Sequence, residues 1–280
     1  MKTKALLTAI FALGIFFTSC EQAVFRPSGN VTTFEKDITG FDALDISHDF
    51  TVFVTSNSDA EGVRIEADDN FHDYIIVEKI GSTLRIGMER INNIRGKRTL
   101  NAYVSAKTLE EIEASGDSKV YLENELQGDK LRIDLGGDSQ LQGSIQVNVL
   151  EADIRGDSKM TMDNMMQGER FMLDIRGDSK FDGSIDVNEF WTDIRGDSKV
   201  DLIGEAGTAR VEVKGDSQIR SYNFAIKTLD ISLSSDSEAY LTVTEEMSVK
   251  ASGDSVMNYK GNPSINAQSL TGDSKLRKAD

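Results

Sequence analysis

The chain has 280 residues and a formal net charge of −16, from 47 acidic and 31 basic side chains. This acidity argues against a nucleic-acid partner and against electrostatic attachment to an anionic membrane. Cys20 is the single cysteine, which excludes a disulfide within the chain.

Residues 1–19 have the pattern of a secretory signal peptide. A basic start at residues 1–4 precedes an apolar segment at 5–17, which is too short to span a bilayer. Cys20 follows directly, as in a bacterial lipobox, and the alternative is an ordinary cleavage site with a leftover thiol. We therefore expect lipidation of Cys20, a tether over residues 20–30, and anchoring to the outer membrane on its periplasmic or cell-surface side.

Residues 31–108 are rich in strand patterns but lack a regular repeat. Apolar and polar residues alternate from Leu44 to Val54, which predicts a diverged coil. Residues 68–74 suit a single helical turn, and residues 94–98 form a basic loop. We expect this part to cap a stack built by residues 109–280, because an open stack exposes unpaired strand edges. No linker divides residues 31–280, so we expect one domain.

Residues 109–280 carry a repeat centred on Gly-Asp-Ser. The copies begin at Gly116, Gly137, Gly156, Gly177, Gly196, Gly215, Gly253 and Gly272, with a degenerate copy at Ser235. A nearly constant period close to 20 is typical of a solenoid. Small or apolar residues alternate with charged ones on both sides of the motif, as in half-buried strands. We predict an all-β, right-handed parallel β-helix with coils of about 20 residues.

Stacking of such coils places identical positions about 4.8 Å apart. The glycines are then expected at a tight bend, and the serines point inward, where their hydroxyls bond one another or the backbone. The aspartates form an outward row. Acidic residues recur three positions before the glycine, and basic residues recur one position before it and three positions after it. We expect the basic rows to neutralise the aspartates and to fix the register of the coils.

The outer surface of the middle coils is the candidate ligand face. Its residues are Arg155, Asp157, Lys159, Arg176, Asp178, Lys180, Arg195, Asp197, Lys199 and Trp191. Trp191 points outward by parity and is either ordinary surface or a stacking platform for a sugar ring. Arg-Gly-Asp-Ser occurs three times, but integrin ligands present this motif on mobile loops. On stacked strands we expect the arginines to pair with neighbouring acids instead.

Signals for catalysis and for metals are poor. His48 and His72 are the two histidines, and neither has a metal-ligand spacing. Equivalent aspartates lack the asymmetry that an acid–base pair requires. The glycine-rich calcium nonapeptide is missing from the sequence. We therefore expect neither an enzyme nor a cofactor or metal.

Three N-terminal segments, residues 40–47, 50–54 and 81–86, resemble the opening of the DUF2807 family, the putative auto-transporter adhesin, head GIN domain. The Gly-Asp-Ser repeats extend the resemblance over roughly residues 31–280. It implies a β-helix, a lipoprotein and an adhesive role. The resulting expectation is a non-enzymatic cell-envelope module that binds a glycan or protein ligand through its charged repeats. The alternatives are a structural or regulatory envelope scaffold and, third, a polysaccharide-active enzyme.

Overall fold

The computed structural model describes residues 24–280, so the predicted signal peptide and the lipidation of Cys20 lie outside the described residues. The described chain is almost entirely strand. Its elements are β1 (Val31–Lys36), β2 (Ala43–Ile46), β3 (Thr51–Thr55), β4 (Gly62–Asp68), the 3-10 helix η1 (Asp69–Tyr74), β5 (Ile75–Ile80), β6 (Thr83–Met88), β7 (Leu100–Ser105), β8 (Glu111–Ala114), β9 (Lys119–Leu122), β10 (Leu126–Leu135), β11 (Gln140–Gly143), β12 (Ile145–Ile154), β13 (Lys159–Gly177), β14 (Lys180–Gly196), β15 (Lys199–Lys214), β16 (Gln218–Ser234), β17 (Glu238–Ala251), β18 (Val256–Lys260), β19 (Ser264–Leu270) and β20 (Lys275–Lys278).

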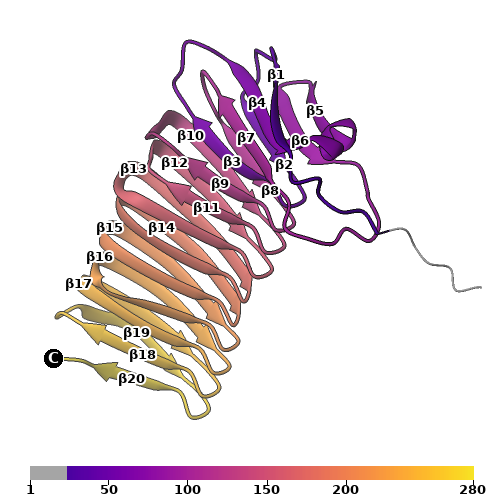
Figure 1. Cartoon of the computed structure of the whole chain (residues 1–280). Helices are drawn as coiled ribbons and strands as arrows, with labels where there is room; N and C mark the ends of the chain where they lie inside the picture. Colours follow the sequence, from indigo (N-terminus) through magenta and orange to yellow (C-terminus); the bar gives the residue numbers. More distant parts are fainter. Residues whose placement is uncertain (1–23) are drawn as a thin grey trace, which may run out of the picture.

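From β8 onward the strands stack into a parallel solenoid (Figure 1), which confirms the predicted fold class. Each coil has three runs, which we call sheets A, B and C. In the coil around β13, sheet A is residues 170–176, before the bend, and sheet B is residues 159–162. Sheet C, residues 166–168, joins the two and pairs with residues 185–187 of the next coil. The extra residues of the longer repeats are absorbed between sheets B and C, where the register shifts between Thr161 and Met165.

The interior is a continuous column of apolar side chains. Alternate positions of each strand are buried, as the period-two pattern requires. Four buried phenylalanines form an aromatic cluster in the middle of the column: Phe171, Phe181, Phe190 and Phe224. Neighbouring ring centroids in this cluster are 5.3 to 5.6 Å apart. Burying a side chain of this size contributes about 1.5–3 kcal/mol, so the cluster anchors the central coils.

The Gly-Asp-Ser bends stack as predicted. Gly177 has a φ of +84°, and a Cβ at this position would lie 2.5 Å from the carbonyl oxygen of Gly156. Glycine is therefore required both by the backbone conformation and by the close approach of the next coil. Ser179 is buried, and its hydroxyl lies 3.0 Å from the carbonyl oxygens of both Gly156 and Arg176. The expected inward serine row is thus satisfied mainly by backbone.

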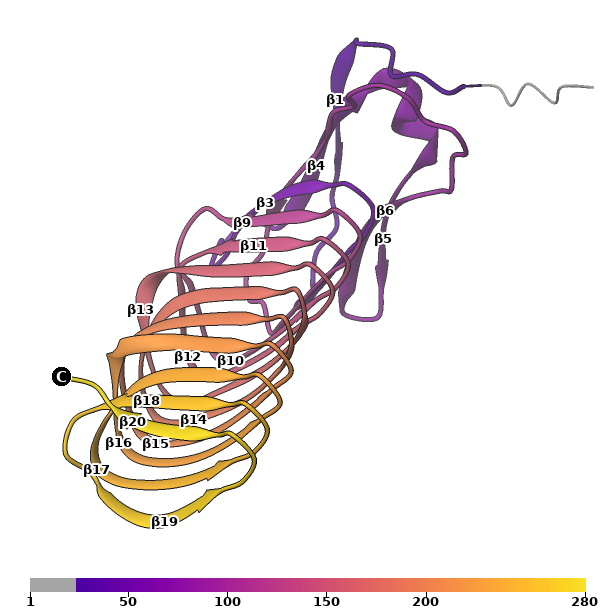
Figure 2. The ribbon, with the colours of Figure 1, turned by 90° about the horizontal axis from the view of Figure 1, so that it is seen from below.

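At the N-terminal end, the order of the coils differs from the order of the chain. The coil formed by β2 and β3 lies between the β8–β9 coil and the β6–β7 coil. Three further strands are antiparallel: β4 pairs with β7, β1 with β4, and β5 with β6. These strands form the cap (Figure 2), so within residues 31–108 only residues 43–55 and 83–105 build coils.

The end of the apolar column is closed by η1, at the position of the predicted helical turn. Its Phe71 is fully buried, and the ring of Phe25 lies 5.0 Å from it. The backbone of Phe25 also pairs with the basic loop, since its N–H donates to Asn93 and its carbonyl accepts from Arg95. The described part of the expected tether is therefore attached to the cap. Within residues 24–280 no helix has the length and apolar character needed to cross a membrane.

Candidate ligand face

The outer surface of sheet A carries two parallel rows of charge. The acidic row consists of Asp134, Asp153, Asp174, Asp193 and Glu212, which are in register from coil to coil. The arginine row consists of Arg155, Arg176 and Arg195, two residues further along the same strands. Both rows project outward because residues two apart on a strand share a face.

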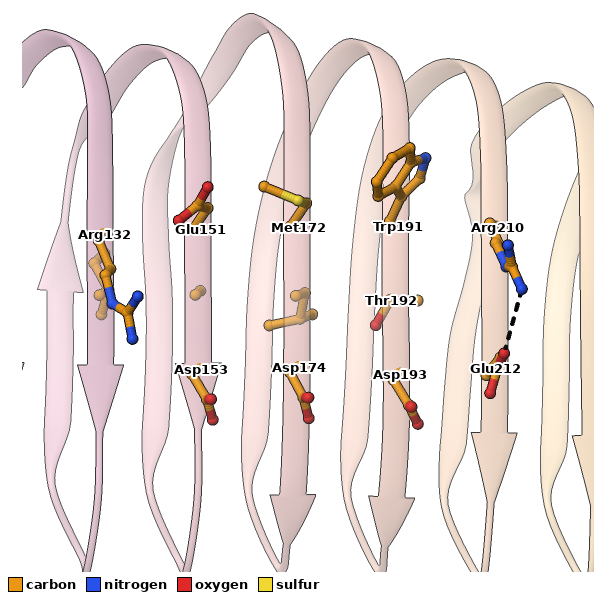
Figure 3. A pocket seen from close by; sticks show the side chains of 13 residues that line it. Arg132, Glu151, Asp153, Met172, Asp174, Trp191, Thr192, Asp193, Arg210 and Glu212 are labelled. Atoms are coloured by element: carbon orange, nitrogen blue, oxygen red, sulfur yellow. Dashed lines mark ion pairs between the residues drawn. The ribbon is translucent and has the colours of Figure 1, made fainter.

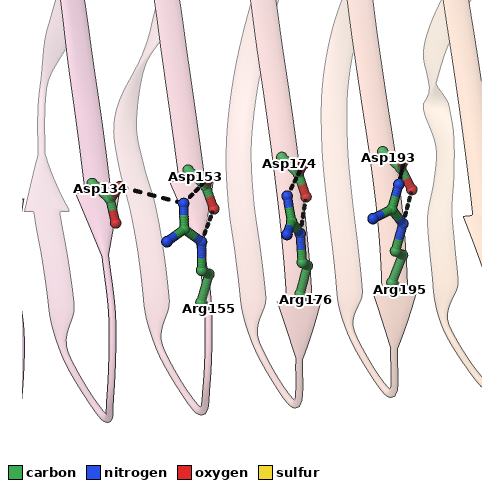
Figure 4. Close-up of polar contacts among 7 residues, drawn as sticks. All are labelled: Asp134, Asp153, Arg155, Asp174, Arg176, Asp193 and Arg195. Carbon is green, nitrogen blue, oxygen red and sulfur yellow. Dashed lines mark hydrogen bonds and ion pairs between the residues drawn. The ribbon is translucent and has the colours of Figure 1, made fainter.

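Each arginine in this row binds the aspartate of its own coil with two nitrogens (Figure 4). The Nε of Arg176 lies 2.8 Å from Oδ1 of Asp174, and its Nη2 contacts Oδ2 of the same carboxylate. The hydrogen bond to Asp174 and the charge of that carboxylate raise the pKa of Arg176. Arg155 also reaches back to Asp134 of the preceding coil, at 3.5 Å. The arginine row therefore fixes the carboxylates of Asp153, Asp174 and Asp193 in place.

The predicted neutralisation of the Gly-Asp-Ser aspartates by the arginines is wrong. Asp157, Asp178 and Asp197 are exposed at the bend, and within residues 24–280 none of their side chains forms an ion pair. Their backbone N–H groups are bound to the glycine carbonyl of the preceding coil. The physical reason is the bend: the arginine shares a strand face with the acid two residues before it, whereas the motif aspartate lies beyond the glycine.

The lysines of the candidate face lie apart from these pairs, on sheet B. Lys159, Lys180 and Lys199 are in register there and exposed. Lys159 approaches Asp182 of the next coil at 3.6 Å. The ten predicted residues thus fall on two sheets and on the bend between them, rather than on one flat surface. The Arg-Gly-Asp stretches are held rigidly, with each arginine paired, unlike a mobile integrin-binding loop.

A groove of about 520 Å³ lies on sheet A beside the acidic row (Figure 3). Opposite the acidic row it is lined by a third row, two residues before the acidic row on the same strands: Arg132, Glu151, Met172, Trp191 and Arg210. Met172 and Trp191 occupy the centre, and the two arginines lie at the ends. The acidic row forms the side of the groove nearest the bend. Met172 stands one repeat before Trp191 and Arg210 one repeat after it, so the sequence already contained this signal.

Trp191 is exposed, as its parity predicted, and it is held in position. The residue is 45% accessible to solvent, whereas its neighbour Phe190 is fully buried. The guanidinium carbon of Arg170 lies 5.1 Å from the centre of the indole, and Arg170 is itself bound by Glu189 at 2.6 Å. These contacts restrict rotation of the indole while leaving much of it open, so it forms a preorganised apolar platform.

Thr192 also lines the groove and carries an unused polar atom. The residue is only 6% accessible, and its Oγ1 has no hydrogen-bond partner within residues 24–280. A buried hydroxyl without a partner is costly. Because this oxygen is itself buried, the groove exposes other atoms of Thr192 and not the hydroxyl.

Sheet B holds one pair of carboxylates in unlike environments. Partial desolvation raises the pKa of Asp201, whose side chain is still exposed, and the adjacent carboxylate of Asp182 raises it further. Both residues line a second hollow together with Arg220 and Tyr222. In the sequence, Asp182 and Asp201 are one repeat apart, as the aspartates of the motif are, so repetition alone does not distinguish them.

The two histidines lie in different parts of the structure and have different partners. His48 occupies the glycine row at the first bend with a φ of +70°, and His72 contacts Thr32 and the ring of Phe34 on the cap. Among residues 24–280 there is no cluster of three or more histidine, cysteine or acidic side chains suited to a metal ion.

Comparison with known sequences identifies the family. The DUF2807 profile, described as putative auto-transporter adhesin, head GIN domain, matches residues 40–163 and 148–263. The chain belongs to the DUF2807 family. This match confirms the resemblance drawn from the sequence, and no curated protein sequence matches the chain.

Several solved structures share the fold of this DUF2807 chain. A putative adhesin from Parabacteroides merdae is 17% identical, with a TM-score of 0.67, and the match covers 91% of this chain and 99% of the other. A putative adhesin from Parabacteroides distasonis is 14% identical, with a TM-score of 0.70 and coverage of 92% and 100%. A protein named putative lipid binding protein, also from Parabacteroides distasonis, is 19% identical, with a TM-score of 0.68 and the same coverage. At these low sequence identities, the comparison shows a shared fold and nothing about a shared ligand or function.

Proposed function

We propose that this DUF2807 chain is a non-enzymatic, adhesin-like binding protein of the bacterial cell envelope. The observation that carries the proposal is the outer surface of sheet A, where fixed charges and an open groove lie on a rigid scaffold. Side chains locked before binding lose little entropy when a ligand arrives. Repetition along the axis also allows many weak contacts to add up over an extended partner. Both properties suit a protein that holds a polymer or another surface.

The proposed location rests on the sequence. The signal-peptide pattern of residues 1–19 and the position of Cys20 support export and a lipid anchor on the outer membrane. Protease treatment of intact cells tests which side of that membrane the protein faces. Digestion of the protein in intact cells means a surface position, and protection until the outer membrane is opened means a periplasmic one. Replacement of Cys20 by alanine should release the protein from the membrane fraction.

The binding function is tested by applying the purified chain to an array of glycans and matrix proteins. We expect binding to one ligand class, and loss of that binding when sheet A is altered by Trp191→Ala together with Asp174→Asn. Altering sheet B by Lys180→Ala and Lys199→Ala provides the matched control, which should bind as the parent does. An array without any bound ligand would favour the alternative of an envelope scaffold.

A polysaccharide-cleaving enzyme is favoured by one observation, the unlike carboxylates Asp182 and Asp201. The raised pKa of Asp201 is the property that a general acid requires. Release of reducing sugars from polysaccharides, lost in Asp201→Asn and kept in Asp178→Asn, would support that function. We expect no release from the parent chain or from either variant, because the proposed binding surface lies on sheet A, whereas Asp182 and Asp201 lie on sheet B.

A further inference from the structure

The groove on sheet A has a chemistry more specific than that of a general adhesive surface. Its centre is apolar and aromatic, from Met172 and Trp191, and one side is lined by carboxylates. Taking the proposed function as its basis, we infer that this groove binds a neutral, hydroxyl-rich glycan, with one pyranose ring stacked on the indole of Trp191.

The stacking follows from the platform. A pyranose has an apolar face of C–H groups, and these carry a small positive charge that the negative face of an indole attracts. Trp191 is 45% accessible and is steadied by Arg170, so the platform exists before the ligand arrives. The sulfur of Met172, in the same row on the preceding coil, extends the apolar area by one repeat. A sugar ring placed here therefore loses water from one face only. Its hydroxyls remain free to form hydrogen bonds with protein groups beside the indole.

The neutrality of the ligand follows from the charges beside the platform. Asp174 and Asp193 lie along one side of the groove, and their carboxylates accept hydrogen bonds from the arginine row. A carboxylate has about four acceptor positions, so each still has oxygen lone pairs that point outward and can accept hydrogen bonds from sugar hydroxyls. These same carboxylates would repel the uronate or sulfate groups of an anionic glycan.

The arginines at the two ends of the groove add a second observation. Arg132 and Arg210 at the two ends can donate to ring or glycosidic oxygens of neighbouring sugars, and this fits a chain of sugars that runs across several coils.

The test uses the purified full chain and the fluorescence of its tryptophan. Because the chain contains one tryptophan, any change in indole emission on binding reports on Trp191 itself. The probes are three neutral hexasaccharides, built of glucose, mannose or N-acetylglucosamine, and two anionic ones, hexagalacturonate and a heparin hexasaccharide. We expect at least one neutral probe to bind and to change the emission, and we expect the anionic probes to bind at least tenfold more weakly.

Variants locate the binding by calorimetry. Trp191→Ala should lower the affinity for the neutral probe at least tenfold, and Trp191→Phe should lose less because it keeps an aromatic face. Met165→Ala is the matched control, since Met165 is also 45% exposed but lies outside the groove, and it should bind like the parent. The pair Asp174→Asn and Asp193→Asn should weaken the neutral probe while improving hexagalacturonate.

Other results would overturn the inference in distinguishable ways. Tighter binding of an anionic probe, unchanged emission at saturation, or full affinity in Trp191→Ala would each show that the groove does not hold a neutral glycan. If the array of glycans and matrix proteins nevertheless gives a ligand, the adhesin-like function stands and only the inference of a neutral glycan is wrong. If nothing on the array binds, the adhesin-like function and the neutral-glycan inference are both wrong.

Discussion

The most constrained residues of the molecule are the glycines of the stacked bends. Each combines a left-handed backbone with the carbonyl oxygen of the neighbouring coil at a distance that excludes a Cβ. Two adjacent glycines allow a direct comparison. Gly137 has a φ of +74°, and a Cβ there would lie 2.8 Å from the oxygen of Gly116, whereas a Cβ on Gly136 would meet open space.

We therefore expect Gly137→Ala to destabilise the fold by about 1–3 kcal/mol, the usual cost of a residue held in a strained conformation. Gly136→Ala should be neutral or slightly stabilising, because it reduces the freedom of the unfolded chain without strain in the folded one. Urea unfolding of both variants measures the difference. Equal midpoints for the two variants would mean that the bend relaxes, and that glycine is not required by the stack.

Glu113 continues the line of the acidic row beyond Asp134, where no arginine stands two residues further along the strand. It is in register with Asp45 and Asp134, and the residues two positions after these three acids are Ser47, Ser115 and Gly136. Burial raises the pKa of Glu113 above its ordinary value of 4.5, and the charges of Asp45 and Asp134 raise it further.

This shift has a defined effect on stability. A carboxyl with a raised pKa in the folded state binds more protons there than in the unfolded state, so stability falls as pH rises through that range. Glu113→Gln should therefore melt at a higher temperature than the parent at pH 7, and the gap should shrink as pH falls towards 4.5. Glu151→Gln is the control, because Glu151 pairs with Lys130 at 2.7 Å and its charge does not act on Glu113, so its loss should bring no gain. A gap that widens on acidification would contradict the assignment.

At the scale of the strand, the arginine row acts as a counter-charge for the acidic row of sheet A. A single substitution, Arg176→Ala, should change stability by at most about 1 kcal/mol, because exposed ion pairs contribute little. Replacing Arg155, Arg176 and Arg195 together leaves three stacked carboxylates about 4.8 Å apart without compensation.

We expect this triple variant to lose more stability than the three single variants combined, and we expect high salt to recover part of the loss. The lysine row gives the control: Lys159, Lys180 and Lys199 changed together to alanine should have a small effect, since within the described residues only Lys159 of the three has an ion pair, at 3.6 Å. Denaturant midpoints at low and at high salt decide the question. Additive losses that salt does not alter would mean that the arginines serve another role.

The repeat made much of this arrangement predictable. Its period and its alternation of apolar and charged residues determined the solenoid, the glycine bend and the inward serine, because stacking converts sequence position directly into a row. It did not reveal which acid each arginine would bind. Parity tells which face a side chain occupies, but the partner depends on how the chain turns at the bend. The antiparallel strands β1, β4 and β5 were equally hidden, since alternation is the same in both strand directions.

The groove was predictable from the sequence only in part. The sequence placed Trp191 on the outer surface, yet a groove is a property of neighbours on several coils. Met172 and Arg210 are one repeat away from it, and their positions follow once the register is known. The unsatisfied hydroxyl of Thr192 could not be read from the sequence, because parity assigned it to the interior without showing whether its oxygen found a partner.

The whole molecule is organised in one dimension, because each coil contacts mainly the coil before it and the coil after it. Its two ends differ. The N-terminal end is closed by antiparallel strands and by Phe71, whereas at the other end of the described residues β19 is exposed throughout and pairs with β17 alone. We therefore expect stability to vary along the axis, with the highest protection in the coils of β13 to β16.

This organisation predicts that a defect in the core acts locally. Phe190 and Phe50 are both fully buried, the first in the central aromatic cluster and the second in the coil of β2 and β3. Phenylalanine-to-alanine changes in a core cost about 3–5 kcal/mol. If coils communicate only with their neighbours, Phe190→Ala should speed amide hydrogen exchange most in β13 to β16 and least in β2 and β6. Phe50→Ala should produce the reverse pattern, with the largest change near the cap.

Exchange measured by mass spectrometry, peptide by peptide, resolves the two profiles. The same uniform increase in both variants would instead mean that the solenoid opens as a single cooperative unit, and the one-dimensional description would then fail.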